Sequence, residues 1–171
     1  YVSSPTSLFD HLEWQLRVSI LFDQSEREIA VRLLGGLDER GYVAPDISQI
    51  VAVEMEIAET EVESVLYKLQ EFDPAGVCSR SLTECLTIQA QQLGITDELV
   101  YAIIEHYLQK ASKNMLPQIA KATKRPLDDV KKALKVISGL EPRPARNFSF
   151  LPAETIRPDI YVYRNNDEFT I

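Results

Sequence analysis

The sequence predicts an all-α protein made of two small helical subdomains with helix-turn-helix-like units, followed by an extended tail with a β-hairpin. Apolar residues recur at three- and four-residue spacing along most of the chain, as they do on the buried face of a helix. Only 6 Gly and 9 Pro occur among 171 residues, and they separate long periodic segments. The alternation typical of strands is confined to DIYVYRNNDEFTI at the end.

The N-terminal subdomain is predicted to span residues 1–77 and to contain four helices. Ser7 is the expected N-cap of the first helix. Its apolar face is formed by Leu8, Leu12, Leu16 and Ile20, widened by Trp14, Val18 and Leu21. Ser25 and Glu28 have the spacing of a capping box for the second helix, and Gly41 is expected to end it. The four predicted helices cover residues 7–22, 25–41, 46–54 and 59–72.

The C-terminal subdomain is predicted over residues 78–142, with Ser79 and Thr96 as the N-caps of its first two helices. Its predicted helices cover residues 79–93, 96–110, 116–124 and 127–138. Gln89 lies on an apolar stripe, so we expect it to be buried with its amide bonded to backbone or to a facing helix. Prolines interrupt residues 143–171, and an isolated hairpin is marginal, so we expect a poorly anchored tail.

The stretch LQEFDPAGVCSRSLTECL, from Leu69 to Leu86, contains the junction between the subdomains. Pro74 cannot continue a helix and Gly76 allows a sharp turn, so the pattern predicts a rigid joint. Asp73 and Arg80 flank this joint, which suggests an ion pair across it. Tyr42 follows a glycine and is interpreted as an exposed aromatic side chain.

The net charge of −8 hides two halves of opposite sign. Residues 1–104 hold 6 Lys/Arg and 18 Asp/Glu, whereas residues 105–171 hold 12 and 8. The region 110–146 alone has a net charge of +7, from 10 basic and 3 acidic residues. It is either a solvated lysine-rich surface or a face that approaches phosphate or an acidic protein. The candidates for proximity to nucleic acid are Lys121, Lys124, Arg125, Lys131, Lys132, Lys135, Arg143 and Arg146.

Two segments of the chain read alike and have the pattern of helix-turn-helix units. Counted from Ile50, apolar residues follow at offsets of 12, 16 and 19, and counted from Ile119 they follow at 11, 15 and 18. This alignment implies a slip of one residue in the turn. The first unit carries Glu59, Glu61 and Glu63, which we expect to be solvated and to repel DNA. The second supports at most weak, non-specific proximity to DNA, because it lacks side chains placed to read bases.

The sequence shows no catalytic or metal-binding constellation, so no enzyme activity and no cofactor are expected. Cys78 and Cys85 lack metal-ligand spacing, and both are predicted to be free thiols, with Cys85 buried. His11 and His106 are isolated and are interpreted as ordinary, partly exposed histidines. No segment has the length and hydropathy of a membrane span or the order of a signal peptide, and we expect a cytoplasmic protein.

Ordered motifs along the chain resemble the core-binding domain of bacterial sigma-54 factors, the enhancer-dependent sigma subunits of RNA polymerase. The resemblance covers SLFDHLEWQL, AVRLLGGLDERGYV, LQEFDPAGVCSRSLTECLTIQ, LEPRPARNF and IRPDIYVY. The segment Cys78–Ser81 departs from it, because the family more often has Gly-Ala-Arg-Asp there. Ala145 stands where Gly is usual. These departures put the local turn geometry in question.

The resemblance implies a non-catalytic domain that docks a sigma factor on core RNA polymerase, through its β and β′ subunits, in the nucleoid region of a bacterium. It implies that promoter DNA and an ATP-dependent activator are bound by other regions, so we expect the chain to be a fragment. The acidic N-terminal half suits a protein-docking surface, in which charge steers and apolar anchors supply affinity. The partner-binding candidates are Leu37, Asp38, Gly41, Tyr42, Asp73, Pro74, Gly76, Val77 and Arg80. The alternative is a self-sufficient helix-turn-helix regulator that binds DNA.

Overall fold

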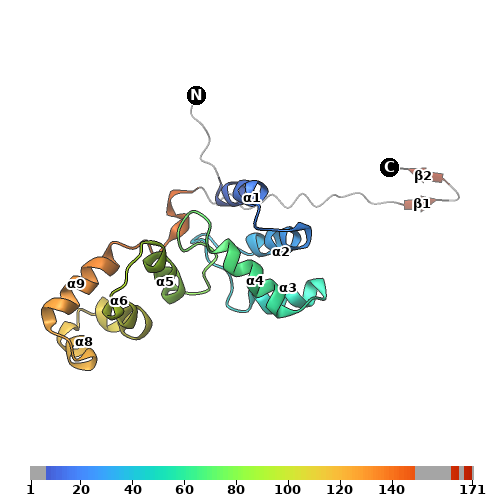
Figure 1. Cartoon of the computed structure of the whole chain (residues 1–171). Coiled ribbons are helices and arrows are strands. Elements are labelled where there is room, and N and C mark those ends of the chain that lie inside the picture. The colour runs from blue at the N-terminus through green and yellow to red at the C-terminus, as the bar shows by residue number, and fades with distance from the viewer. Residues whose placement is uncertain (1–6, 149–162, 166–167, 171) are drawn as a thin grey trace.

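The computed structural model describes residues 7–148, 163–165 and 168–170, and the described residues up to Phe148 are helical or irregular, as the all-α prediction requires. Figure 1 shows two groups of helices, with α1–α4 in one and α5–α9 in the other. The helices of the first group are α1 (Leu8–Val18), α2 (Gln24–Gly35), α3 (Ile47–Met55) and α4 (Glu59–Leu69). Those of the second are α5 (Leu82–Gln92), α6 (Glu98–Ala102), the π-helix η1 (Ile103–Tyr107), α7 (Leu108–Ser112), α8 (Leu116–Thr123) and α9 (Leu127–Ser138).

Among the described residues, three further elements follow the second group. A 3₁₀-helix, η2 (Pro144–Asn147), leads the chain back to α1 (Figure 1). Strands β1 (Tyr163–Asn165) and β2 (Glu168–Thr170) pair antiparallel, with Tyr163 opposite Thr170. Most of the predicted tail lies outside the described residues, and the hairpin as a unit stays a prediction.

The predicted helical stripes form two separate apolar cores. In the first, α1 contributes residues at four-residue spacing and α4 the residues predicted for it. Its buried members include Leu8, Leu12, Leu16, Leu33, Val62, Val65, Leu66, Leu69 and Ala145. Phe22 and Phe72 meet in this core edge to face, with ring centroids 5.7 Å apart. The second core joins α5 to α9 and includes Leu86, Ala90, Leu99, Val100, Ile103, Ile104, Ile119, Val130, Ala133 and Leu140.

Several predicted helix ends are wrong by a few residues, and competing polar groups explain them. The capping box of α2 is formed by Asp23 and Glu26, and Ser25 donates its hydroxyl to Asp23 instead of capping. Ser79 does not cap α5, because it is buried in the joint, where its hydroxyl donates to the Gly76 carbonyl at 2.6 Å, and the helix starts only at Leu82. The N-cap of α5 is therefore Ser81.

Three further helix ends differ from the prediction: the start of α6 and the C-terminal ends of α1 and α2. Asp97, not Thr96, caps α6. Helix α1 ends at Val18 rather than residue 22, since Arg27 donates hydrogen bonds to the carbonyls of Leu16 and Ser19 there. Ile20, predicted to be buried, is consequently 95% exposed. Helix α2 ends six residues before Gly41, because the chain turns at Gly36, where a Cβ would lie 2.9 Å from the Ile47 side chain.

The two groups of helices repeat one pattern of caps and turns, and we call each group a copy of this unit. Ser7 and Ser81 cap α1 and α5, each accepting from the backbone three residues on, at 3.1 and 3.2 Å. Asp23 and Asp97 cap the helices that follow. Both pairs of caps are 74 residues apart, so the first two helices of each copy start in register.

The last two helices of each copy correspond at a spacing of 68 residues. Glu56 and Lys124 both end a helix in the left-handed conformation, at φ 55° and 54°. The backbone bonds Ile57 N to Ala52 O and Arg125 N to Ala120 O are both 3.1 Å long. The predicted one-residue slip in this repeat is wrong. The buried partner of Ile119 is Val51, at 2% exposure, whereas Ile50 is 42% exposed.

The change of spacing from 74 to 68 residues means that the first copy has six more residues between its second and third helices. The six additional residues lie in the α2–α3 loop, residues 36–46, which contains several of the predicted partner-binding positions. The loop therefore distinguishes the two copies, and it lies where the two groups of helices adjoin.

Candidate functional site

Three segments that are distant in sequence meet where the two helix groups adjoin: the joint (residues 73–80), the α2–α3 loop and the return segment (residues 141–148). Cys78 N donates to the Gly41 carbonyl at 2.9 Å, and Val43 N donates to the Ser79 carbonyl at 3.0 Å. Ala145 N donates to the Arg40 carbonyl at 3.1 Å. Backbone hydrogen bonds thus connect all three segments, and the start of the predicted loose tail is anchored.

The α2–α3 loop is shaped by Asp38. Its carboxylate accepts hydrogen bonds from the backbone of Arg40 and of Tyr42, both at 2.9 Å, and from the Arg40 guanidinium. Partial burial acts to raise the pKa of Asp38, but these hydrogen bonds outweigh it and the net pKa is lowered. The carboxylate therefore fixes the loop in its charged form.

Tyr42 is 5% exposed, which corrects its prediction as an exposed aromatic residue. Its hydroxyl donates to the Pro142 carbonyl at 2.7 Å, a contact across 100 residues of sequence. Burial, with the neighbouring thiol of Cys85, raises the pKa of Tyr42. Tyr42 therefore holds the return segment and cannot present its ring to a partner.

Each copy of the unit ends in an acidic residue followed by a proline. A glutamine side chain binds the backbone N–H and carbonyl of the acidic residue. In the first copy, Gln15 of α1 accepts from Asp73 N at 3.0 Å and donates to Asp73 O at 2.5 Å. In the second, Gln89 of α5 accepts from Glu141 N at 2.8 Å and donates to Glu141 O at 2.6 Å. The prediction that Gln89 is buried and bonded to backbone is confirmed, since it is 5% exposed.

The joint adopts conformations that favour glycine at two positions. Gly76 has φ +84°, and Cys78 has φ +60°. Cys78 therefore adopts the left-handed conformation although it carries a side chain. Burial raises the pKa of the Cys78 thiol to about 12, so the thiol stays protonated. Cys85 is buried as predicted.

The predicted ion pair between Asp73 and Arg80 is wrong. Arg80 instead binds Glu63 of α4 at 2.9 Å and Glu84 of α5 at 2.8 Å. Asp73 lies 3.2 Å from His11 of α1. The spacing of four residues between Arg80 and Glu84 was a signal that the sequence offered for their ion pair. No neighbouring residue in the sequence indicated the pairing with Glu63. Glu63 is half-buried, whereas it was predicted to be solvated.

Glu84 makes the stability of this site depend on pH. Partial burial acts to raise its pKa, but hydrogen bonds from Arg80 and Gln70 prevail and the net pKa lies below the ordinary 4.5. A lowered pKa in the folded state gives stability that is present above about pH 4.5 and lost as pH falls through the folded value. We expect acid unfolding of Glu84→Gln, followed by circular dichroism, to show a shallower loss of stability below pH 5 than the wild type shows.

The matched control is Glu59→Gln, which removes an exposed carboxylate from α4. It should keep the acid dependence of the wild type. Identical acid profiles for the two variants would contradict a role for Glu84.

The remaining partner-binding candidates also lie at the three-segment contact. Gly41, Gly76 and Val77 are buried, and Leu37 and Pro74 are half-buried. Of all nine candidates, only Asp73 is exposed. The structure therefore brings the predicted residues together around one contact, and their role in binding a partner stays a prediction.

An exposed apolar stripe on α1 was missed by the sequence interpretation, which placed it in the core. Trp14, Val18 and Leu21 follow one another at spacings of four and three residues and are 60%, 60% and 54% exposed. Trp14 and Val18 lie on the side of α1 opposite the buried leucines, and Leu21 follows in the turn after the helix ends at Val18. The width of the apolar pattern, too large for one buried face, was the signal available in the sequence.

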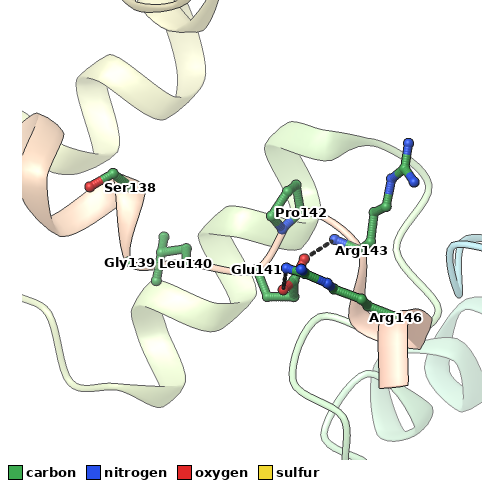
Figure 2. A pocket seen from close by; sticks show the side chains of 7 residues that line it. All are labelled: Ser138, Gly139, Leu140, Glu141, Pro142, Arg143 and Arg146. Carbon is green, nitrogen blue, oxygen red and sulfur yellow. Dashed lines mark hydrogen bonds and ion pairs between the residues drawn. The ribbon is translucent and has the colours of Figure 1, made fainter. Parts of the chain in front are cut away.

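The basic candidates divide into two sets. Lys121, Lys124, Arg125, Lys131, Lys132 and Lys135 are exposed on α8, α9 and the turn between them. Figure 2 shows the other two, Arg143 and Arg146, beside a surface hollow of about 580 Å³ at the end of α9. Glu141 forms part of its wall, accepting from Arg143 N at 3.0 Å and lying 3.6 Å from Arg146. This carboxylate disfavours an anion at that position.

Within residues 7–148 and the two short strands, no group of three or more His, Cys, Asp or Glu side chains could hold a metal ion. No helix in the same residues is long and apolar enough to cross a membrane.

The whole chain, residues 1–171, matches the family model described as sigma-54 factor, core binding domain. The chain belongs to this sigma-54 family. It is 36% identical over 162 residues to RNA polymerase sigma-54 factor 1 of Bradyrhizobium diazoefficiens, covering 95% of this chain and 33% of that protein. It is 31% identical over 170 residues to the RNA polymerase sigma-54 factor of Escherichia coli K12, covering 96% and 35%.

The chain therefore spans about a third of the length of these sigma-54 relatives. A solved structure of the core binding domain of sigma54 is similar over 74% of this chain and 95% of its own, with 24% identity and a TM-score of 0.43. The family predicted from the ordered motifs is confirmed by the family match.

Proposed function

We propose that this chain docks a sigma-54 type transcription initiation factor on core RNA polymerase, as a non-catalytic domain. The observation that carries the proposal is the match of all 171 residues to the core binding domain family. Its partners would be the β and β′ subunits, in the bacterial cytoplasm near the nucleoid. Promoter DNA and the ATP-dependent activator would be bound by other regions of a longer factor, as the greater length of the relatives allows.

The α1 stripe is the surface that supports docking best. Interface energy is concentrated in a few anchors, among which tryptophan is enriched. Trp14 offers such an anchor within the acidic copy of the unit, where negative charge would steer the domain toward basic faces of the polymerase. We propose that residues 1–77 supply the contact surface, and that the three-segment contact fixes their orientation relative to residues 78–142.

Surface plasmon resonance between the chain and core polymerase tests this function. Wild-type chain at micromolar concentration should bind, and Trp14→Ala should weaken binding at least ~10-fold. Leu93→Ala is the matched control, because Leu93 is an exposed apolar residue at 69% exposure on the other copy. Absence of wild-type binding would overturn the function, whereas equal binding by both variants would overturn only the assignment to the α1 stripe.

A self-sufficient DNA-binding regulator is not favoured. The helix pair α3–α4 carries carboxylates at the positions where phosphates would crowd, and α9 begins with Asp128 and Asp129. These charges oppose insertion of either helix pair into a groove.

A further inference from the structure

The helix pairs α3–α4 and α8–α9 share a left-handed turn and the hydrogen bond that follows it, but they carry opposite charge. In residues 53–67 there are five Glu and no basic residue, a net charge of −5. The equivalent residues 121–135 contain six Lys/Arg and two Asp, a net charge of +4. The left-handed residue that ends the first helix is Glu56 in one pair and Lys124 in the other. The difference in charge therefore has no counterpart in the fold and calls for a separate explanation.

The basic side chains of α8–α9 are available to a ligand. All six are exposed, and they come from the C-terminal end of α8, from the loop between α8 and α9, and from α9 itself. Within the described part of the chain, carboxylates lie near only two of them: Asp128 at 4.0 Å from Lys131 and Asp129 at 3.8 Å from Lys132. Figure 1 shows α8 and α9 at the end of the molecule remote from α3, so the acidic pair does not cover this face.

We propose that the face formed by Lys121, Lys124, Arg125, Lys131, Lys132 and Lys135 binds the phosphate backbone of duplex DNA without reading its sequence. Lysine supplies point charges that suit phosphate contacts, and such contacts position a protein on DNA irrespective of sequence. The Asp128 side chain is 85% exposed at the start of α9, where a recognition helix would approach the bases. Helix α9 therefore lies against the backbone, not in the groove.

An acidic protein surface is the competing ligand. Stable protein interfaces need apolar or aromatic anchors at their centre. Residues 121–135 contain no aromatic residue, and Leu127 is only 39% exposed. The contrast with Trp14 on α1 favours phosphate for the basic face and protein for the acidic copy.

The experiment is fluorescence anisotropy of the 171-residue chain with a labelled duplex of about 30 base pairs. Non-specific DNA binding has dissociation constants of about 10⁻⁴ to 10⁻⁶ M at physiological salt. If four phosphates are contacted, the slope of log K against log salt is expected near −3.6. A second duplex of equal length and unrelated sequence should bind within about twofold.

The test variant is Lys124→Glu with Lys131→Glu, which places at both positions the residue found at equivalent sites of α3–α4. It should weaken DNA binding at least ~10-fold. The matched control is Arg17→Glu with Arg32→Glu, which makes the same change in net charge at exposed positions of the first copy. The control should retain affinity within about threefold. Lys124→Gln with Lys131→Gln, with melting followed by circular dichroism, separates loss of binding from loss of folding.

Three outcomes other than the expected ones would overturn the proposal. Equal loss in the test variant and the control would mean that total charge governs binding. Strong preference for one duplex would mean base readout. If the wild type does not bind DNA and the test variant loses polymerase binding, the face contacts protein. The inference does not depend on the proposed function, because the test variant is expected to keep polymerase binding while losing DNA.

Discussion

Replacing Gly76 with alanine is expected to lower the free energy of unfolding by about 3 kcal/mol, because two separate costs add at this position. The backbone of Gly76 is left-handed, at φ +84°, which disfavours any residue with a Cβ. The added Cβ would also lie 2.6 Å from the Cys85 sulfur, 2.8 Å from the Gln89 amide and 3.1 Å from a backbone carbonyl of α5. The joint would have to move away from α5 to accept it. Urea unfolding followed by Trp14 fluorescence measures the effect.

Two other glycines separate these costs. Gly94 is left-handed at φ +69°, but no atom of the described residues lies within 4 Å of its added Cβ. Gly94→Ala should therefore cost only the backbone strain, about 1 kcal/mol. Gly35 lies in α2 with equally open surroundings, and its replacement by alanine should be neutral or stabilising. A loss for Gly76→Ala no greater than for Gly94→Ala would contradict the close contact with α5.

Replacing Gln89 with leucine is expected to cost about 2 to 3 kcal/mol. Leucine fits the buried volume, but it leaves the N–H and carbonyl of Glu141 without the partners that Gln89 provides. A partly buried backbone group without a partner carries a penalty of about 1 kcal/mol or more. Denaturation gives the total, and amide hydrogen exchange at Glu141 should become faster in the variant.

The repeat supplies the control for this substitution. Gln15→Leu removes the same pair of bonds at the equivalent place, but there the bonds to Asp73 are exposed to water. Water replaces lost partners at an exposed site, so this variant should cost about 1 kcal/mol or less. If the two variants lose equal stability, burial does not set the strength of these bonds.

The buried faces of the helices were predictable because each depends on local spacing. The period of three to four residues places Val62, Leu66 and Leu69 in the first core, where the structure has them. The same stripe predicted correctly that Gln89 is buried. The family was also predictable, since its motifs can be recognised without knowledge of the fold.

The helix caps and the positions of the candidate site residues were harder to predict from the sequence. Ser79 has the residue type and spacing of an N-cap, but the joint uses its hydroxyl for a bond to Gly76. Tyr42 follows a turn glycine, a common setting for an exposed ring, yet its partner is Pro142, far along the chain. Local sequence states which groups can form such bonds, whereas the fold decides which of the available partners each group meets.

The register of the internal repeat shows the same limit. Ile50 and Ile119 are the natural pair by residue type, but Val51 is the residue that α3 turns inward. Valine and isoleucine next to each other leave the helical face ambiguous by one residue. The equivalent left-handed turns at Glu56 and Lys124 resolve it, and neither residue type would suggest that conformation.

The return segment has a consequence for how the chain folds as it is synthesised. Ala145 is buried in the first core and its amide bonds to Arg40, although the whole second copy of the unit is translated between them. Domains generally fold from the N-terminus as they emerge from the ribosome. Here the first core lacks one of its own members until residue 145 has emerged, so the N-terminal copy reaches its final packing only after the C-terminal copy has left the exit tunnel.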